Sequence, residues 1–537
     1  MRGDWVYNLI GENDLKNARE QILRNRGITE ALLNVGEESV EDYMNYDNII
    51  EGCKLLMKHI EVGNEICVLI DCDSDGITSS ALLVNYLYRE FPTINLVLKH
   101  HSGKQHGLSD KNIKIDNGIK LVVVPDAGTN DLEEIEELYS RNIEVLVLDH
   151  HELEAEYPKY GILINNQTSK RVKNKSLSGV GIVYKFLCAF SEYYYLDSPH
   201  EFIDIVALGN IADVMDAKSP ETRYYIKEGL KNIKNPFIKA LIKEKEFDMD
   251  GKINMTTIGW NISPLLNGCI RSGRIIEKEK LYTVMITNKD CEGVARICKN
   301  AKARQDSAVK NSMVKIEKTL KINEEDKVII ASSCGASKSQ TGLIAGKLAS
   351  KYKKPTFLYS NEDEIVKGSA RGLGNINLKE DLINSGLASG IGHSLAFGFE
   401  FKHNDIEKIR GYFNKLYKDV DFGSTGYEVD FELTAFDIYQ EFVDEIASME
   451  DEWGNGLNAP LIAIKDFCLE LNNNNLKGKT NVVWNIYGIK CVKKFTSKVW
   501  KEEFLNKKTY VDIIGRCILD TYSGKGCIEV VDVLKIN

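Results

Sequence analysis

The sequence predicts an α/β fold built on a doubly wound parallel sheet, and a repeated pattern is the reason. Short apolar runs that end in polar residues recur at EICVLIDCDSDG, KLVVVPDAGTND and IEVLVLDHHELE. Helical segments such as ITSSALLVNYLYREF and LEEIEELYSRN lie between them. Strands that alternate with helices favour a parallel sheet, and such sheets bind ligands at the carboxyl ends of their strands. We therefore expect the polar residues that end these three runs to lie at the edge of the sheet where ligands bind.

The length of the chain predicts several domains, because one hydrophobic core rarely serves 537 residues. We expect an N-terminal helical segment over residues 1–60 and the doubly wound domain over residues 61–250. A helical connector follows over residues 251–325 and contains KNAKARQDSAVKNSMVKIEKTLK. A second α/β domain begins near KVIIASS and covers residues 326–422, and the strand-like segments of residues 423–537 predict a small β-barrel.

Composition and charge disfavour several classes of protein. No apolar run approaches the roughly 20 residues that span a bilayer, and the first residues lack the apolar core of a signal peptide. We therefore expect a cytoplasmic protein that does not contact a membrane. The twelve cysteines form no CxxC pair, which disfavours a zinc knuckle and predicts structural thiols. The net charge of -10 disfavours bulk coating of nucleic acid, but it is compatible with an enzyme whose carboxylates bind metal.

Carboxylates crowd the end of the first predicted strand. Asp71, Asp73 and Asp75 stand at alternate positions where a buried strand meets its turn, so several of them can point into one small space. Such crowding needs a cation, and oxygen ligands favour Mg²⁺ or Mn²⁺. A plain Asp-rich surface turn is the alternative. An EF-hand is disfavoured because the loop lacks the Glu that would close it.

The same pattern recurs at two further strand ends and in one helix. Asp126 follows the apolar run LVVV, and Asp149, His150 and His151 follow VLVL. The repetition favours a shared metal site over a solvated loop, and an imidazole ligand favours Mn²⁺ over Mg²⁺. Asp213 lies in the apolar segment ALGNIADVM, where an ionised carboxylate needs a partner. Asp213 is either a cap of the next helix or the last metal ligand.

Four motifs follow one another along the chain: DCDSDG, the Asp of VVVPDAG, the DHH triplet and the Asp of ALGNIADV. Together and in this order they resemble the four phosphoesterase motifs of the DHH superfamily. The segments ILRNRGI, SGVGIVYKF, ISPLLN with the following SGR, KGSARG, GIGHSLAFG and WGNGLNAP resemble the RecJ branch of that superfamily. The resemblance covers nearly the whole chain. It implies that the second α/β domain is a DHH-associated substrate-binding domain and that the barrel is an OB-fold.

The resemblance also implies an activity and a catalytic site. The activity would be 5′ to 3′ exonucleolytic hydrolysis of single-stranded DNA, in DNA repair, recombination or replication, with a metal-bound hydroxide as nucleophile. Two divalent ions, Mn²⁺ or Mg²⁺, would be held by Asp73, Asp75, Asp126, His150 and Asp213. Asp71 would be a further ligand or would support one, and His151 would lie nearer the scissile phosphate.

For the substrate, the resemblance implies binding by Arg274, Ser369, Arg371, Gly392 and His393. A guanidinium fork suits a terminal phosphate, and a Gly-rich loop lets the backbone approach it. Without the resemblance, an Arg or His in such a loop is more simply a solvated residue. The chain departs from the RecJ pattern at Ile391 and Phe397, so we expect packing at the 5′-end pocket to differ. Lys104 and His106, in the altered segment KHHSGKQHGLS, receive no role.

The predicted barrel interleaves lysines with aromatic residues, among them Lys490, Lys494, Trp484, Tyr487, Phe495 and Trp500. Lysines can follow the phosphates of a single strand while aromatic faces stack on its bases. The alternative is an ordinary barrel with aromatic residues in its core and lysines that only aid solubility.

We expect a monomer whose partners are single-stranded DNA with a 5′ end and a single-strand-binding protein or helicase. Two other functions stay open. One is a phosphodiesterase for short oligoribonucleotides or dinucleotides, which the terminal barrel disfavours. The other is a catalytically inactive nucleic-acid-binding replication factor, which the complete set of expected metal ligands disfavours.

Overall fold

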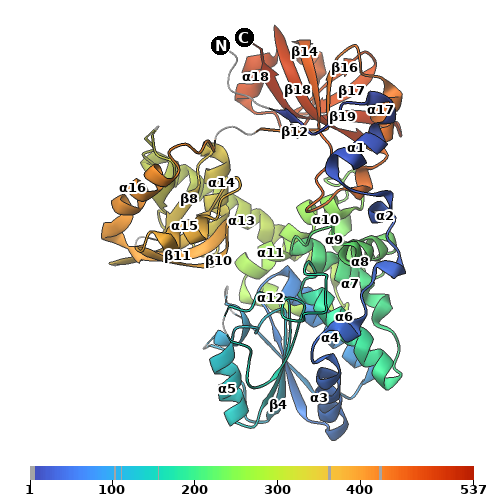
Figure 1. Ribbon diagram of the computed structural model, residues 1–537, viewed down its shortest axis with the longest axis vertical. Helices are drawn as coiled ribbons and strands as arrows, with labels where there is room; N and C mark the ends of the chain where they lie inside the picture. The colour runs from blue at the N-terminus through green and yellow to red at the C-terminus, as the bar shows by residue number, and fades with distance from the viewer. Residues whose placement is uncertain are drawn as a thin grey trace. The chain divides into compact units, whose positions relative to one another are not determined.

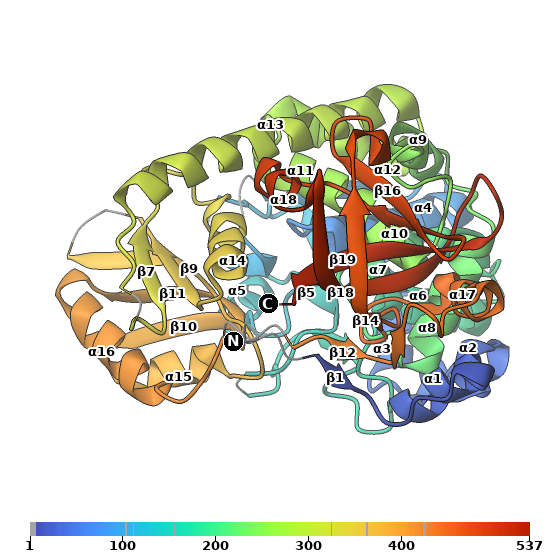
Figure 2. The same ribbon diagram turned by 90° about the horizontal axis from the view of Figure 1, so that it is seen from above.

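The structure is a computed structural model that describes residues 7–101, 105–110, 112–154, 156–323, 325–360, 364–422 and 426–536. Lys104 lies outside these residues. The chain forms two compact units, one of Asn8–Lys299 with Glu428–Asn537 and one of Asn300–Tyr427. The long helix α13 (Cys291–Thr319) contributes residues to both units (Figure 2). The five-domain division stays a prediction.

The first unit contains the predicted parallel sheet. Its five strands stand in the order β3-β2-β4-β5-β6, and every neighbouring pair is parallel. The strands are β2 (Glu65–Ile70), β3 (Leu96–His100), β4 (Ile119–Pro125), β5 (Glu144–Asp149) and β6 (Ile162–Asn165). The three strands that the sequence predicted are the central ones. The two edge strands β3 and β6 were not predicted, because one is only half-buried and the other has four residues.

Helices cover both faces of this sheet, as a doubly wound fold requires. On one face, α5 (Leu132–Ser140) packs Ile135 and Leu138 against valines of β4 and β5. The other face is covered by α3 (Ile49–Val62), α4 (Ser74–Glu90) and α6 (Gly179–Tyr194). Figure 1 shows α3 and α5 on opposite sides of β4. Because both faces are covered, the central strands consist mainly of the apolar runs ICVLI, LVVV and VLVL.

From α7 to α13 the chain is helical, as predicted. Helix α7 (Ile203–Ala212) packs against α4, α6 and α8 (Pro220–Lys231). Helices α9 (Pro236–Lys245), α10 (Met255–Asn261), α11 (Ser263–Ser272) and α12 (Ile275–Thr287) follow before α13. None of the helices among the described residues has the length and apolar character needed to cross a membrane.

The second unit is built on a mixed sheet in the order β10-β11-β9-β8-β7. Its elements are β7 (Ile329–Ser332), α14 (Thr341–Tyr352), β8 (Thr356–Tyr359), β9 (Ile365–Arg371), α15 (Leu378–Asn384), β10 (Ala388–His393), β11 (Ala396–Lys402) and α16 (Ile406–Leu416). Ser369, Arg371, Gly392 and His393 lie on paired strands and not in the loops we expected. The expectation failed because the glycines sit inside a β-hairpin ladder.

The C-terminal part of the first unit is a seven-stranded, mainly antiparallel sheet of the OB-like kind that the sequence predicted. In sheet order its strands are β13 (Phe431–Thr434), β14 (Ile462–Leu471), β18 (Lys507–Leu519), β19 (Gly526–Lys535), β17 (Ile489–Lys493), β16 (Asn481–Ile486) and β15 (Leu476–Lys477). Helices α17 (Gln440–Ala447) and α18 (Lys498–Phe504) pack on it.

The beginning of the chain is joined to this C-terminal sheet. Strand β1 (Asn8–Leu9) pairs in parallel with β12 (Glu428–Val429), and the two lie side by side in Figure 2. Residues of α1 (Ala18–Arg26) share one hydrophobic core with α17 and the sheet. Arg26 makes two hydrogen bonds, of 2.6 and 2.7 Å, to the buried carboxylate of Asp430. The N-terminal helical segment thus completes the C-terminal core.

Candidate metal centre

Three aspartates follow β2, and a glycine allows them to crowd together. Asp73 is the N-cap of α4 and accepts hydrogen bonds from the amides of Asp75 (3.0 Å) and Gly76 (3.1 Å). A Cβ on Gly76 would lie 2.5 Å from the Cβ of Asp71, which is closer than van der Waals contact allows. The DCDSDG motif is therefore a helix start that tolerates no side chain at its glycine.

Asp75 is oriented by the first turn of α6. Its buried carboxylate accepts hydrogen bonds from the amides of Gly179 (2.6 Å) and Val180 (3.2 Å) and from the Ser178 hydroxyl (3.0 Å). Burial, aided by the negative charge of Asp73, raises the pKa of Asp75 to about 6. A carboxylate that is aligned by hydrogen bonds but unfavourable as a bare anion is suited to bind a cation.

Asp126 follows β4 and is the most constrained of the acidic residues. Its backbone lies in the left-handed region (φ 63°), and its amide donates a 2.8 Å hydrogen bond to the carbonyl of Leu148. Burial and the charges of Asp75 and Asp73 raise its pKa well above the ordinary value. Its Oδ1 is buried and has no hydrogen-bond donor among the described residues. A divalent cation would satisfy this oxygen.

His150 brings an imidazole to the same place. Its Nε2 lies 3.2 Å from Oδ1 of Asp126 and 3.5 Å from Oδ2 of Asp213. Asp213 directly follows the last residue of α7. Burial together with the charge of Asp75 raises the pKa of Asp213 to about 8. Ligand atoms of Asp75, His150 and Asp213 all lie within 4.8 Å of one another. These distances favour the metal-ligand interpretation of Asp213 over that of a helix cap.

Asp71 lies beside the metal centre and contacts residues outside it. Its Oδ2 lies 2.7 Å from Nδ1 of His106, while its Oδ1 accepts from the amide of Gly107 (3.2 Å) and lies 3.5 Å from Nε2 of His101. It still has a ligand atom within 4.8 Å of Asp73 and Asp126. With both oxygens already engaged, Asp71 is placed to hold its neighbours in position.

His151 and Asp149 form a pair at the edge of the centre. Asp149 is buried and accepts from the amide (3.0 Å) and hydroxyl (2.6 Å) of Thr129 and from Nδ1 of His151 (2.7 Å). Burial alone would raise the pKa of Asp149, but the charge and hydrogen bond of His151, together with His150 and Thr129, outweigh burial and lower the pKa. Burial alone would lower the pKa of His151, but the charge and hydrogen bond of Asp149 raise it to about 9. Half of the His151 side chain stays exposed.

Two arginines three residues apart behave differently. Arg271, in the last turn of α11, places its guanidinium 4.0 Å from Oδ2 of Asp73. Arg274, which the sequence resemblance singled out, pairs with Glu277 at 2.8 Å, and its side chain is 76% exposed. Arg271 and the positioning residue Asp149 were both missed by sequence reasoning. The signal for Asp149 was its place as the first letter of DHH; Arg271 carried none beyond its closeness to the SGR motif.

Three of the four predicted substrate residues of the second unit share one face of its sheet, whereas Gly392 is opposite the buried Phe397 on the other face. Cross-strand pairing places Arg371 opposite Ala396, which in turn is opposite His393. Ser369 is opposite Gly398, and its hydroxyl lies 2.8 Å from that of Thr341 at the start of α14. A Cβ on Gly342 would lie 2.6 Å from Nη2 of Arg371, so that glycine leaves room for the guanidinium.

The two departures from the RecJ pattern have different consequences in the structure. Phe397 is 3% exposed and packs in the hydrophobic core of the unit, with its ring 6.3 Å from that of Phe357. Ile391 is 81% exposed and lies opposite Gly398, in the row that contains Ser369. Of the two residues, Ile391 is the one that alters the face carrying the predicted substrate residues.

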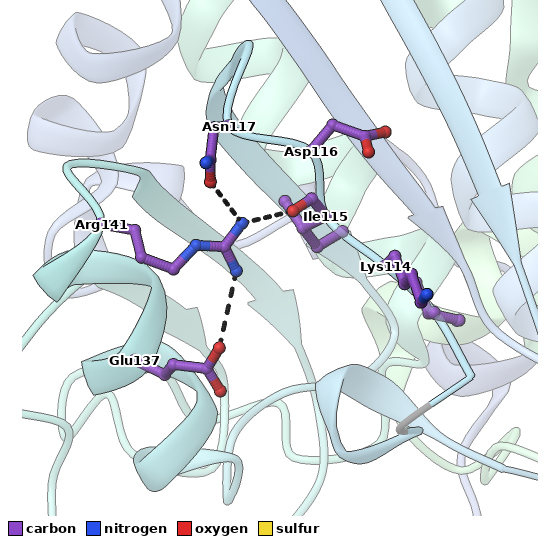
Figure 3. A pocket seen from close by; sticks show the side chains of 7 residues that line it. Lys114, Ile115, Asp116, Asn117, Glu137 and Arg141 are labelled. Atoms are coloured by element: carbon purple, nitrogen blue, oxygen red, sulfur yellow. Dashed lines mark hydrogen bonds and ion pairs between the residues drawn. The ribbon is translucent and has the colours of Figure 1, made fainter.

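A separate hollow of about 390 Å³ lies beside Arg141 (Figure 3). Arg141 donates hydrogen bonds to the carbonyl of Ile115 and to Asn117 (3.0 Å), and it lies 3.5 Å from Glu137. The hollow is next to the amino end of β4, whereas Asp126 follows the carboxyl end of that strand. The hollow therefore does not belong to the metal centre.

Known proteins resemble this chain over most of its length. Residues 65–210 match the model of the DHH family, N-terminal domain. A Bacillus subtilis protein named as an SPbeta prophage-derived single-strand DNA-specific exonuclease is 35% identical over 562 residues, which cover 97% of this chain and 96% of that protein. Bacillus subtilis RecJ, named a single-stranded-DNA-specific exonuclease, is 25% identical over 380 residues, covering 68% of this chain and 47% of RecJ.

Among solved structures, RecJ of Thermus thermophilus in complex with Mn²⁺ matches this fold with a TM-score of 0.79. The match covers 100% of this chain and 80% of that one, at 19% sequence identity. At this identity the structural likeness shows the fold, and the activity must be argued from the site.

Proposed function

The chain belongs to the RecJ-like exonucleases of the DHH family, and on that premise we propose that it is a metal-dependent enzyme that removes nucleotides from the 5′ end of single-stranded DNA. The observation that carries the proposal is the buried Asp126 carboxylate, whose Oδ1 lacks a donor among the described residues and faces His150. The relatives' names supply the substrate class, because they are single-strand DNA-specific exonucleases.

The residues of the centre fit two hard divalent cations, Mn²⁺ or Mg²⁺. Four carboxylates and one imidazole supply the oxygen and nitrogen donors that these ions prefer: Asp73, Asp75, Asp126, His150 and Asp213. When bound, a metal pair supplies an activated water and stabilises charge on the phosphate. Asp73 and Asp75 would then be aligned by the amides that bind them, and Asp126 by its left-handed backbone.

Two cationic side chains would contact the phosphate directly. His151, whose Nδ1 is held by Asp149, has a half-exposed side chain and would donate a hydrogen bond from Nε2 to the scissile phosphate. Arg271 would offer its guanidinium to the same phosphate once a metal replaces it as the partner of Asp73. Both residues would stabilise charge that grows in the transition state.

The polarity would come from the second unit. Arg371, Ser369 and His393 lie on one sheet face, and the first turn of α14 adjoins them through Thr341 and Gly342. A guanidinium fork beside a helix N-terminus is a favourable place for a phosphate dianion. We propose that this face binds the 5′-terminal phosphate, with Gly392 keeping the hairpin open to it.

The decisive experiment compares wild type with Asp126→Ala on 5′-labelled and 3′-labelled single strands in Mn²⁺. Wild type should release mononucleotides from the 5′ end, and the variant should be slower by about a thousandfold or more because it loses a shared metal ligand. Arg371→Ala should keep the chemistry but lose the preference for a 5′-phosphate. Full activity of Asp126→Ala, or wild-type shortening only from the 3′ end, would contradict the proposal.

Two rival functions are tested by the same preparation. A strong preference for di- or trinucleotides in competition with long DNA would favour the short-oligonucleotide phosphodiesterase. A lack of hydrolysis on any nucleic acid would favour an inactive binding factor. From family membership we further propose a cytoplasmic monomer that acts in repair, recombination or replication beside a single-strand-binding protein or helicase, which sedimentation and pull-down assays would test.

A further inference from the structure

A sulfur ligand lies next to the metal centre, in a group of side chains that the proposed mechanism does not use as ligands. Asp71, Cys72 and His106 each offer one ligand atom, and these atoms lie within 4.8 Å of one another. Nδ1 of His106 is 2.7 Å from Oδ2 of Asp71 and 3.9 Å from Sγ of Cys72. The five ligands proposed for Mn²⁺ or Mg²⁺ include no sulfur.

The donor set of this group is typical of zinc. Thiolate and imidazole bind Zn²⁺ far better than they bind Mg²⁺. With Zn–S near 2.3 Å and Zn–N or Zn–O near 2.0 Å, a tetrahedral ion holds its ligand atoms about 3.3 to 3.6 Å apart. The observed separations of 2.7 and 3.9 Å from Nδ1 lie on either side of that range, so small side-chain rotations would suffice. Three protein ligands would leave a fourth position for water.

A second observation points to the same place. Nε2 of His101 is completely buried, has no hydrogen-bond partner among the described residues, and lies 3.5 Å from Oδ1 of Asp71. Its Nδ1 faces the carboxylate of Asp110 at 3.1 Å. An imidazole with a carboxylate behind it commonly orients or joins the ligands of a metal. His101 is thus placed to steady Asp71 or to enter the coordination sphere itself.

We propose that Asp71, Cys72 and His106 form a third divalent-metal site that is selective for Zn²⁺ over Mn²⁺ and Mg²⁺. Cys72 is 3% exposed and His106 is 58% exposed, so the imidazole gives the ion a path from solvent to the buried sulfur. A bound ion would fasten the segment around Gly107–Ser109 to the end of β2. Cys72 would then be a ligand and not the structural thiol that the sequence indicated.

Cobalt spectroscopy tests the site without measuring nuclease activity. Metal-free protein is first saturated with Mn²⁺ and then titrated with Co²⁺, whose bonds to thiolate absorb in the near ultraviolet. We expect this absorption to saturate at one Co²⁺ per chain and to be removed by excess Zn²⁺. Cys72→Ser should abolish it, and His106→Gln should weaken Co²⁺ binding at least tenfold.

The matched control is Cys468→Ser. Cys468 is half-buried and belongs to none of the metal-binding groups found among the described residues, so its replacement should leave the absorption unchanged. The proposal is overturned if folded wild type shows no thiolate absorption, or if the absorption survives Cys72→Ser. Neither result bears on the exonuclease proposal, which the strand-cleavage assay tests separately.

Discussion

Asp126 combines two properties that are unfavourable in a protein with no ligand bound. Its backbone lies in a region that non-glycine residues seldom occupy, and its carboxylate is buried beside other carboxylates. Local strain of this kind persists at sites where the surrounding structure enforces it. Here the enforcing contact is the hydrogen bond from its amide to Leu148 on the neighbouring strand.

At the same scale, Arg271 is expected to affect the rate of reaction. Arg271→Gln should lower kcat about tenfold with little change in KM, because a charge near the reacting phosphate is lost. Arg271→Lys should recover part of the rate. Steady-state kinetics on single-stranded DNA would measure both variants. The control is Arg274→Gln, at the N-cap of α12, which should mainly raise KM. Equal effects on kcat from both variants would contradict this division.

The sequence singled out the acidic residues and the histidine that the structure brings together, but not the contacts that support them. These residues were recognisable because they end an apolar run or interrupt an apolar helix, as Asp126 and Asp213 do. The supporting contacts join residues that no local pattern links: Asp71 with His106, and Asp73 with Arg271. Arg271 is about 200 residues from Asp73 in the chain, and a contact between such distant residues produces no periodic pattern in the sequence. Only the folded structure reveals contacts of this kind.

Helix α6 shows how one element positions the centre. Its first two amides align Asp75, while a Cβ on Gly179 would lie 2.4 Å from Oδ1 of Asp126. The helix therefore begins with glycine so that two carboxylates can approach its N-terminus. The same close approach explains why the segment SGVGIVYKF belongs to the site although it contains no metal ligand.

Gly179→Ala is accordingly expected to abolish tight metal binding. The added methyl group would displace Asp126, so Mn²⁺ affinity measured by calorimetry should fall a hundredfold or more. Gly259→Ala is the matched control, because a Cβ there meets only Ile211 at 3.4 Å. Gly259 lies in α10, where alanine should be neutral or should stabilise the protein by about 0.5 to 1 kcal/mol. Wild-type Mn²⁺ affinity in Gly179→Ala would refute this account of the helix.

The C-terminal sheet separates aromatic residues that looked alike in the sequence. Trp484 is buried in the core, and Trp500 packs on Phe504 with ring centroids 4.9 Å apart. Tyr487 is 65% exposed and contacts the 83% exposed ring of Phe436 at 5.2 Å. The sequence did not distinguish the buried aromatic residues from the exposed ones. The strands of this region are short and interrupted by turns, so the alternation of buried and exposed positions is hard to follow.

The Phe436–Tyr487 pair is the part of this sheet expected to stack on bases. Tyr487→Ala or Phe436→Ala should weaken binding of single-stranded DNA about tenfold, since one base–aromatic contact contributes about 1 to 3 kcal/mol. Fluorescence anisotropy with catalytically inactive Asp126→Ala protein would measure the affinity. Tyr522→Ala serves as the control, because Tyr522 is 98% exposed in the turn before β19. Unchanged affinity in both pair variants would remove the stacking role.

For the whole molecule, the crowded carboxylates make stability depend on pH and metal. In the metal-free protein, burial raises the pKa of Asp75 to about 6 and that of Asp213 to about 8. The folded state then holds these protons more tightly than the unfolded chain, whose carboxyl pKa is about 4. Their contribution to stability is complete below that value and is lost as the pH rises through the folded-state values.

We therefore expect the Tm of the metal-free protein to fall between about pH 4, the unfolded-state pKa, and about pH 8, the higher folded-state pKa. Saturating Mn²⁺ should raise Tm most at the upper end, where the ligands have lost their protons. Differential scanning calorimetry at several pH values would measure both effects. Asp213→Asn should flatten the fall, because it removes the group with the higher pKa. A shift caused by Mn²⁺ that did not vary with pH would contradict the assignment.

The pairing of β1 with β12 and of Arg26 with Asp430 has a consequence for biosynthesis. The two residues of that ion pair are separated by 404 positions. At translation rates of about 5 to 20 residues per second, α1 would leave the ribosome about 20 to 80 s before the sheet that receives it. The first helix must therefore wait, with its apolar side uncovered, until the last part of the protein is made. A chain released before residues 428–536 are made would leave the apolar side of α1 without the core that covers it.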